Sequence, residues 1–92
     1  MSSMITPPPV TATPMRPVRL DYVRGAAHPF RFILDGSTYP VQQIFRVTRE
    51  FAIRPGERDT TVFHCRLAYR LFCELHYVEA TGEARVRWVP EA

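Results

Sequence analysis

The sequence feature that most constrains the fold is a strict alternation of side-chain character between residues 63 and 77. Eight consecutive odd positions are apolar or aromatic, and the even positions between them are mostly polar. The odd positions hold Phe63, Cys65, Leu67, Tyr69, Leu71, Cys73, Leu75 and Tyr77. A period of two is typical of a β-strand with one buried face, because successive side chains point to opposite sides of a sheet. The stretch is therefore predicted to be strand.

A helix over residues 60–79 is the alternative for this stretch. Leu, Ala, Arg and Glu favour helices, and Asp59 or Thr60 could cap one. Its apolar residues, however, would surround the helix and leave only a narrow polar stripe. A straight strand of this length would span roughly 50 Å at about 3.3 Å per residue, which is too long for so small a domain. We expect it to bend sharply, or to break near residues 67–69 into two paired strands.

Shorter alternating runs occupy the rest of the chain. They lie at residues 18–22, 30–34, 39–47 and 85–89. Turn or loop signals separate them at Asp35-Gly36, at Pro55-Gly56 within residues 50–60, and at residues 80–83. Ile44 breaks the parity of its run, which indicates a β-bulge near residues 42–44. A sheet this small must curl to bury its apolar face and hide its edges. The predicted fold is all-β: a small antiparallel, partly open barrel of five or six strands.

The N-terminal segment has a different composition. Residues 1–17 contain five of the nine prolines and favour extended polyproline conformations. We predict a disordered Pro-rich tail over 1–17 and a single β-barrel domain over 18–90, because 92 residues are too few for two cores. The stretch Pro14-Met15-Arg16-Pro17 also matches a PxxP docking pattern.

Composition limits the environment and the partners. No apolar run approaches the roughly 20 residues of a membrane-spanning helix, so no membrane association is predicted. Two cysteines and the lack of an export signal favour a cytoplasmic location. All 12 basic side chains are Arg, and the net charge is +3. The absence of Lys reflects either GC-rich coding or selection for the guanidinium, which pairs with phosphate and stacks on bases.

Metal binding and catalysis find little support. The metal candidates His64, Cys65, Cys73 and His76 fall on opposite parities of the alternation, so they cannot easily converge on one ion. If the chain folds back near Tyr69, Cys65 faces Cys73 and a disulfide becomes geometrically feasible, although a reducing cytoplasm opposes it. No nucleophile has an activating base, and the glycines are isolated. We predict no catalytic residues, metal or cofactor, and a protein that is not an enzyme.

Two groups of residues suggest nucleic-acid binding. The first surrounds the 50–60 loop and consists of Arg46, Arg49, Phe51, Arg54 and Arg58. The second lies on the polar parity of the long alternation and consists of Arg66, Arg70, Phe72 and His76. Arg on phosphate and an aromatic ring on a base are typical of small barrels that bind DNA or RNA. Acidic residues interleave with both groups, which is also what an ordinary solvated surface looks like.

Protein binding is the leading hypothesis. Phe72 and Val78 lie on the polar parity and could extend an interface. Unpaired strand edges could add a strand from an unidentified protein partner, or pair with a second copy to give a homodimer. The sequence therefore predicts a non-catalytic accessory or adaptor module, with nucleic-acid binding as the alternative.

The chain also resembles a family of small all-β bacterial domains of unknown function, over residues 17–89. The resemblance rests on Phe30-Arg31-Phe32, Gly36, Tyr39-Pro40-Val41, Cys73-Glu74-Leu75-His76-Tyr77, Thr81-Gly82 and Trp88. Some members sit beside proteins of the translesion DNA polymerase class, which implies a role in DNA transactions by association. Members usually carry a Trp soon after the Tyr-x-Val strand, where this chain has Phe51. The resemblance supplies no catalytic residues.

Overall fold

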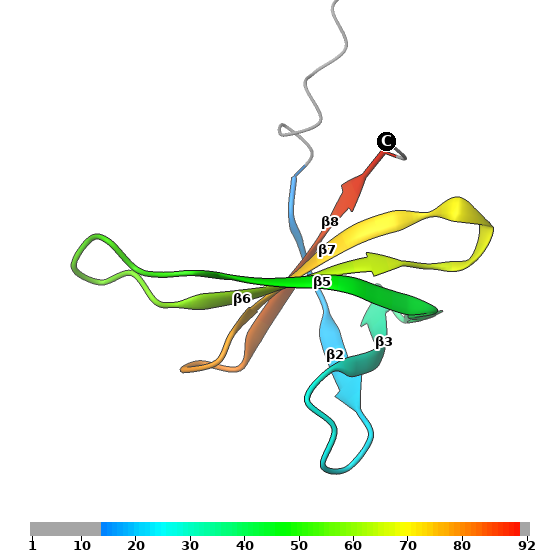
Figure 1. Cartoon of the computed structure of the whole chain (residues 1–92), viewed down its shortest axis with the longest axis horizontal. Helices are drawn as coiled ribbons and strands as arrows, with labels where there is room; N and C mark the ends of the chain where they lie inside the picture. Colours follow the sequence, from blue (N-terminus) through cyan, green and yellow to red (C-terminus); the bar gives the residue numbers. More distant parts are fainter. Residues whose placement is uncertain (1–13, 91–92) are drawn as a thin grey trace, which may run out of the picture.

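The computed structural model describes residues 14–90, which form β-strands joined by turns and loops (Figure 1). These residues contain no α-helix, and the predicted all-β class is confirmed. The strands are β1 (Arg16–Pro17), β2 (Arg19–Tyr22), β3 (Pro29–Leu34), β4 (Ser37–Pro40), β5 (Gln43–Glu50), β6 (Thr60–Arg66), β7 (Phe72–Val78) and β8 (Glu83–Val89).

The strands form two antiparallel sheets that share two bent strands. The larger sheet has the order β1-β8-β7-β6-β5 and the smaller has the order β2-β3-β4. β1 continues into β2 through Val18, whose N–H donates to the Ala84 carbonyl at 3.0 Å. β4 continues into β5 through residues 41–42, which bond to Phe30 on one side and to Arg66 on the other. With each continuous pair counted as one bent strand, the partly open barrel has six strands, as predicted.

The long alternation over residues 63–77 breaks into two paired strands, which is one of the two outcomes predicted for it. β6 and β7 pair antiparallel, with Phe63 opposite Leu75 and Cys65 opposite Cys73. A 3₁₀ turn at Ala68–Arg70 reverses the chain. The helix over 60–79 is therefore excluded.

The odd-numbered side chains of β6 and β7 pack against the smaller sheet to form the core. Phe32, Leu75 and Val86 are fully buried, and the Phe32 ring stacks on Tyr39 with centroids 5.1 Å apart. Tyr39 also meets Trp88 edge-on at 5.7 Å. Burying one such side chain stabilises the fold by about 1.5–3 kcal/mol. This burial fixes the register of the larger sheet and directs its even-numbered β6 and β7 side chains to the outer face.

Two β-bulges move aromatic residues out of the positions that simple alternation predicts. In β3 the pairing shifts near Phe30, which is 41% exposed instead of buried, with the Arg31 guanidinium 5.0 Å from its ring centroid. In β5 the register shifts between Ile44 and Arg46, next to the predicted bulge at 42–44. Phe45 is the extra residue, and it lies on the outer face instead of continuing the inward parity.

The predicted boundary between tail and domain needs one correction. Residues 1–13 lie outside the described residues. Arg16 and Pro17, assigned to the tail, form β1 and pair with Val86 and Arg85 of β8. A proline is tolerated there because β1 is a two-residue edge strand, where a missing N–H costs little.

Candidate functional site

The outer face of the larger sheet carries four of the predicted site residues: Arg46, Arg66, Phe72 and Val78. Among residues 14–90, no strand or helix forms a second layer over it. Its side chains form four rows that cross the sheet from β5 to β8, because the strands pair in register. The rows are Gln43-Arg66-Phe72-Val89, Arg46-His64-Glu74-Arg87, Thr48-Val62-His76-Arg85 and Glu50-Thr60-Val78-Glu83.

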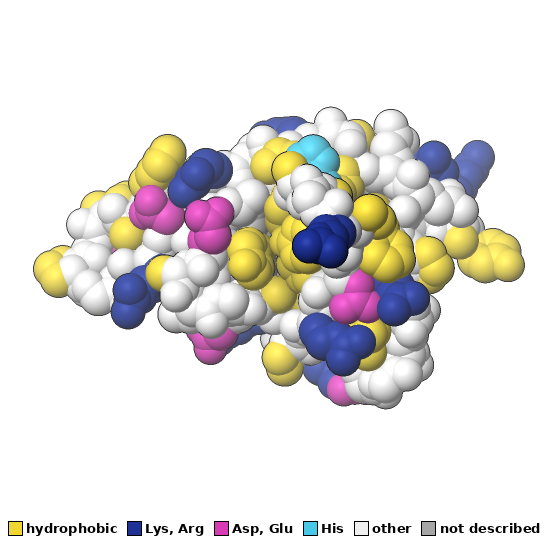
Figure 2. Space-filling model, turned by 90° about the horizontal axis from the view of Figure 1, so that it is seen from below, with side chains coloured by type: hydrophobic (Ala, Val, Ile, Leu, Met, Phe, Trp, Pro, Cys, Tyr) yellow, Lys and Arg dark blue, Asp and Glu magenta, His cyan; other side chains and the backbone are white. Residues whose placement is uncertain are grey.

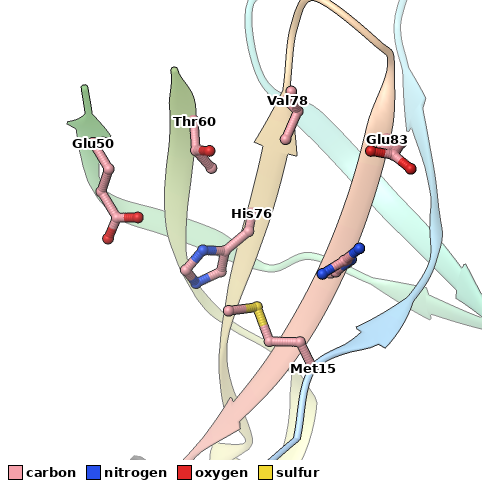
Figure 3. A pocket seen from close by; sticks show the side chains of 7 residues that line it. Met15, Glu50, Thr60, His76, Val78 and Glu83 are labelled. Atoms are coloured by element: carbon pink, nitrogen blue, oxygen red, sulfur yellow. The ribbon is translucent and has the colours of Figure 1, made fainter. Parts of the chain in front are cut away.

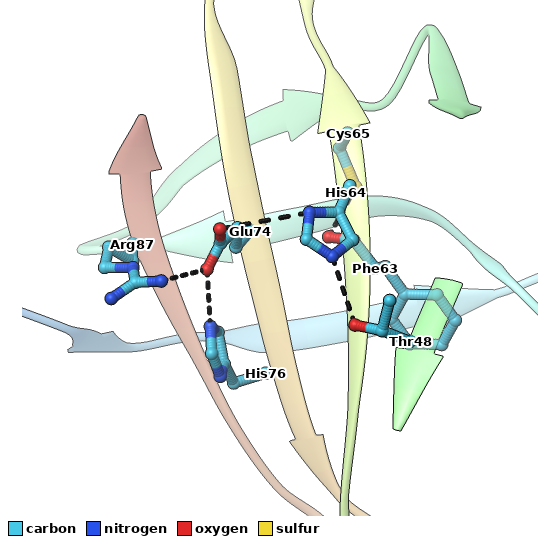
Figure 4. Close-up of polar contacts among 7 residues, drawn as sticks. All are labelled: Thr48, Phe63, His64, Cys65, Glu74, His76 and Arg87. Carbon is cyan, nitrogen blue, oxygen red and sulfur yellow. Dashed lines mark hydrogen bonds and ion pairs between the residues drawn. The ribbon is translucent and has the colours of Figure 1, made fainter. Parts of the chain in front are cut away.

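Glu74 is the centre of a polar network in the second and third rows (Figure 4). Its Oε1 accepts hydrogen bonds from Arg87 Nη2 at 2.5 Å and from His76 Nε2 at 2.9 Å. Its Oε2 lies 3.9 Å from His64 Nδ1. The opposite nitrogen of that ring, Nε2, lies 3.1 Å from Thr48 Oγ1. The network therefore ties all four long strands together on their outer side.

Burial and hydrogen bonding set the charge states of this network. Burial alone would raise the pKa of Glu74, but the hydrogen bonds from His76 and Arg87 outweigh it and hold the pKa below its usual value. The pKa of His64 is lowered, mainly because burial disfavours the imidazolium, although the Glu74 carboxylate opposes this. Near neutral pH, Glu74 is ionised and His64 is largely neutral.

An apolar hollow lies at the end of the sheet next to the β6–β7 turn. Phe45, from the β5 bulge, meets Phe72 edge-on with ring centroids 6.1 Å apart, and it lies 6.3 Å from the His64 ring. These rings, with Glu74 and Val89, line a hollow of about 340 Å³. Phe45 is 53% exposed. The predicted interaction residue Phe72 thus lies at the wall of a hollow, half-buried.

The second predicted interaction residue, Val78, lies at the other end of the same face. It lines a shallow hollow of about 220 Å³ together with Met15, Thr60 and His76 (Figure 3). Phe72 and Val78 occupy the two ends of β7, about 20 Å apart at roughly 3.3 Å per residue. The apolar hollow therefore lies at the Phe72 end of the face, whereas the Val78 end also carries the carboxylates of Glu50 and Glu83.

The four arginines predicted around the 50–60 loop do not form one cluster. Arg46 lies in the second row of the outer face, opposite His64. Arg49 is on the other side of β5, where its Cζ is 5.7 Å from the Phe51 ring centroid. Arg54 and Arg58 lie in the loop after β5. Alternation along β5 places Arg46 and Arg49 on opposite faces of the sheet, and Phe51 contacts Arg49.

The acidic residues of this loop bind its backbone. Glu57 accepts hydrogen bonds from the N–H groups of Ile53 at 3.1 Å and Arg54 at 3.0 Å, and these bonds lower its pKa. Asp59 accepts one from the Ala52 N–H at 2.9 Å. Within residues 14–90, Arg54 and Arg58 have no carboxylate partner. The acids order the loop, and its exposed side chains include Phe51 and Ile53.

The second predicted nucleic-acid group is also divided. Arg66 lies beside Phe72 on the outer face, and its guanidinium donates to the side-chain oxygens of Gln42 and Gln43, each at 3.3 Å. Arg70 is in the 3₁₀ turn with φ 61°, not on the strand face where the alternation put it. The chain reverses between these two arginines, so they do not share a strand.

Sequence reasoning missed three residues of this face. Phe45 was assigned to the inward parity, and Glu74 and Arg87 were not recognised as partners. The break in the alternation at Ile44 was the one sequence signal that could have placed Phe45 on the outer face. The Glu74–Arg87 pair depends on the register of β7 with β8, which no local pattern reveals.

The two cysteines lie on the core side, separated from the two histidines. Cys65 and Cys73 are buried opposite each other and are free thiols. A hydrogen bond involving Cys65 and burial both raise the pKa of Cys73. His64 and His76 face outward. The predicted separation of the four side chains onto two faces is confirmed.

No family model matches the chain, and comparison with curated proteins and with solved structures gives no significant match. The resemblance to small all-β bacterial domains thus stays an expectation. No helix within the described part of the chain has the length and apolar character needed to cross a bilayer.

Proposed function

We propose that this chain is a non-catalytic accessory or adaptor module that binds a protein partner on the outer face of its larger sheet. The observation that carries the proposal is the Phe45–Phe72 ring pair beside an apolar hollow, on a face without a covering layer among residues 14–90. Aromatic residues next to a pocket are typical anchors of protein interfaces.

The charges of the face favour a protein over a polyanion. Glu74 lies in the second of its four rows and is paired with Arg87, and Glu50 and Glu83 both lie in the fourth row. A nucleic-acid strand needs a continuous positive track for its phosphates, and these carboxylates interrupt one. A protein surface can instead match alternating charges one by one.

The buried thiols support the non-catalytic part of the proposal. Cys65 is fully buried and Cys73 is 2% exposed, and the raised pKa of Cys73 disfavours its thiolate. A thiol that is neither accessible nor ionised is a poor nucleophile. The Glu74 carboxylate is similarly occupied by Arg87 and His76.

The proposal is tested by affinity capture with the Phe45→Ala/Phe72→Ala double variant. The wild-type chain is expected to capture a defined protein. The double variant is expected to capture at least about tenfold less of that protein, which corresponds to the loss of one aromatic anchor. Phe30→Ala is the matched control, because Phe30 is also an exposed aromatic at a bulge but lies on the smaller sheet. Equal capture by all three chains would contradict the proposal.

Nucleic-acid binding through the 50–60 loop is the second candidate. It is favoured by Arg54 and Arg58, which lack a carboxylate partner among the described residues, and by Phe51, which is 67% exposed. Fluorescence anisotropy with labelled single- and double-stranded DNA and RNA tests it at two salt concentrations. Binding that weakens steeply with salt, and that Arg54→Ala/Arg58→Ala abolishes, would support this candidate. If the chain binds only a protein on its outer face, no nucleic-acid binding that depends on Arg54 and Arg58 is expected.

A further inference from the structure

The outer edge of β5 is unpaired. β5 is the terminal strand of the larger sheet, and no described strand lies along its free side. It is eight residues long, whereas the edge at the other end of that sheet is the two-residue β1. A long free edge exposes backbone N–H and C=O groups that can pair with another strand.

Apolar side chains follow this edge. Phe45 and Val47 in β5 are 53% and 42% exposed, and Phe51 and Ile53 directly after it are 67% and 92% exposed. Figure 2 shows hydrophobic atoms at the end of the molecule where the 51–59 loop projects. An exposed edge with apolar residues is an aggregation liability unless a defined partner covers it.

The charges on the outer side of β5 are arranged symmetrically. Arg46 and Glu50 lie on the same side of the strand with Thr48 midway between them. Neither has an ion-pair partner within residues 14–90. The five residues from Arg46 to Glu50 also pair regularly with β6, because the bulge lies before them.

We propose that two copies of the chain associate through their β5 edges, antiparallel about a two-fold axis at Thr48. This register places Arg46 of each copy opposite Glu50 of the other and gives two ion pairs. It also sets Thr48 opposite Thr48, and Val47 opposite Arg49 on the other face. A two-fold axis perpendicular to the sheet allows only registers centred on a residue.

The other centres within β5 place no unlike charges opposite each other. A centre at Arg46 or Arg49 sets two arginines against each other, and a centre at Glu50 does the same with two carboxylates. A centre at Val47 leaves Arg46 opposite Thr48. Because like charges directly opposite destabilise a strand pair and unlike charges stabilise it, Thr48 is the favoured centre.

The dimer goes beyond the proposed function and does not depend on it. The two larger sheets join into one ten-stranded sheet whose outer faces are continuous. Each copy's residues 51–53 then run alongside residues 43–45 of the other, which covers exposed apolar groups. The Phe45–Phe72 hollow is repeated twice on this face, so a dimer would present two copies of the proposed binding site.

Sedimentation velocity of the purified full chain over a wide concentration range tests the proposal. The wild type is expected to dimerise reversibly. Arg46→Glu and Glu50→Arg each turn two attractive pairs into two repulsive ones, so each is expected to raise the dimer Kd at least about tenfold. The double variant Arg46→Glu/Glu50→Arg restores the unlike pairs and is expected to recover dimerisation.

Arg54→Glu is the matched control, since it makes the same charge change outside the paired window and should leave the Kd unchanged. Circular dichroism checks that each variant is folded. A wild type that stays monomeric at all concentrations would overturn the proposal. A dimer that both single reversals leave intact, or that the double reversal fails to restore, would overturn this register. Loss of partner capture by the Phe45→Ala/Phe72→Ala chain bears only on the proposed function.

Discussion

At the scale of single residues, Glu74 does most to organise the outer face. It receives hydrogen bonds from Arg87 and His76 and lies within ion-pair distance of His64, so three strands depend on one carboxylate. Its side chain is only 16% exposed. Removing a partner from a charged group this buried is costly, because the remaining charge is left without compensation.

Neutralising Glu74 is therefore expected to destabilise the fold. Glu74→Gln keeps the shape but weakens the charge-assisted bonds and leaves Arg87 half-buried without a counter-charge. We expect the free energy of unfolding to fall by about 1–2 kcal/mol near pH 7, measured by urea denaturation. Glu79→Gln, an exposed carboxylate on the following turn, is the control and should change stability little. Equal stability of the two variants would mean that the network contributes nothing.

The same network makes stability depend on pH. The pKa of His64 lies below 6.5 in the folded chain, so the unfolded chain takes up a proton first as the pH falls below 6.5, and stability declines. The pKa of Glu74 lies below 4.5, so its contribution is present above pH 4.5 and is lost as the pH falls further. Urea midpoints across this range should drop on acidification.

Two variants separate these contributions. His64→Gln should flatten the decline that begins near pH 6.5, and Glu74→Gln should flatten the decline below pH 4.5. A wild type that gains stability on acidification between these two pH values would contradict the assignment to His64, and one that gains stability on acidification below pH 4.5 would contradict the assignment to Glu74.

At the scale of elements, the turn between β6 and β7 is the least expected feature. Tyr69 and Arg70 have φ values of 62° and 61°, and the Leu71 N–H donates to the Ala68 carbonyl at 3.3 Å. Two consecutive positive φ values are typical of a type I′ hairpin turn, which favours Asn-Gly. Bulky L-residues pay a steric cost in this region.

Replacing this pair with Asn-Gly is expected to stabilise the hairpin. Tyr69→Asn/Arg70→Gly should raise the free energy of unfolding by about 1–2 kcal/mol, because both residues then accept positive φ without strain. Thermal or urea denaturation measures the change. Arg54→Gly, at a residue without positive φ, should bring no gain. A destabilised double variant would show that Tyr69 or Arg70 contributes more through contacts than it costs through strain.

The strands themselves were largely predictable from the sequence, since the period of two over 63–77 survives in the core side chains of β6 and β7. The bulges were less so. The break in parity at Ile44 indicated one bulge, but no local pattern indicated that Phe30 would be exposed. A bulge depends on the register with the partner strand, which the alternation within a single strand does not reveal. The break of the long alternation was predictable from length alone.

At the scale of the whole molecule, the two sheets have different roles. The smaller sheet closes one side of the core, while the larger sheet is packed on its inner side and has no described strand or helix layered over its outer side. The candidate site could be predicted only in part. Phe72 and Val78 were identified by parity, but the two predicted arginine groups are divided in the structure, because neighbouring residues in a strand point to opposite faces and the chain turns between Arg66 and Arg70.

Photo-crosslinking in cells tests the outer-face assignment most directly. A photoreactive phenylalanine is placed at position 72, and the same residue at position 30 is the control. Binding on the outer face predicts a discrete crosslink from position 72 to another protein, and none from position 30, which lies on the smaller sheet. Crosslinking from position 30 alone, or to nucleic acid from position 72, would contradict it.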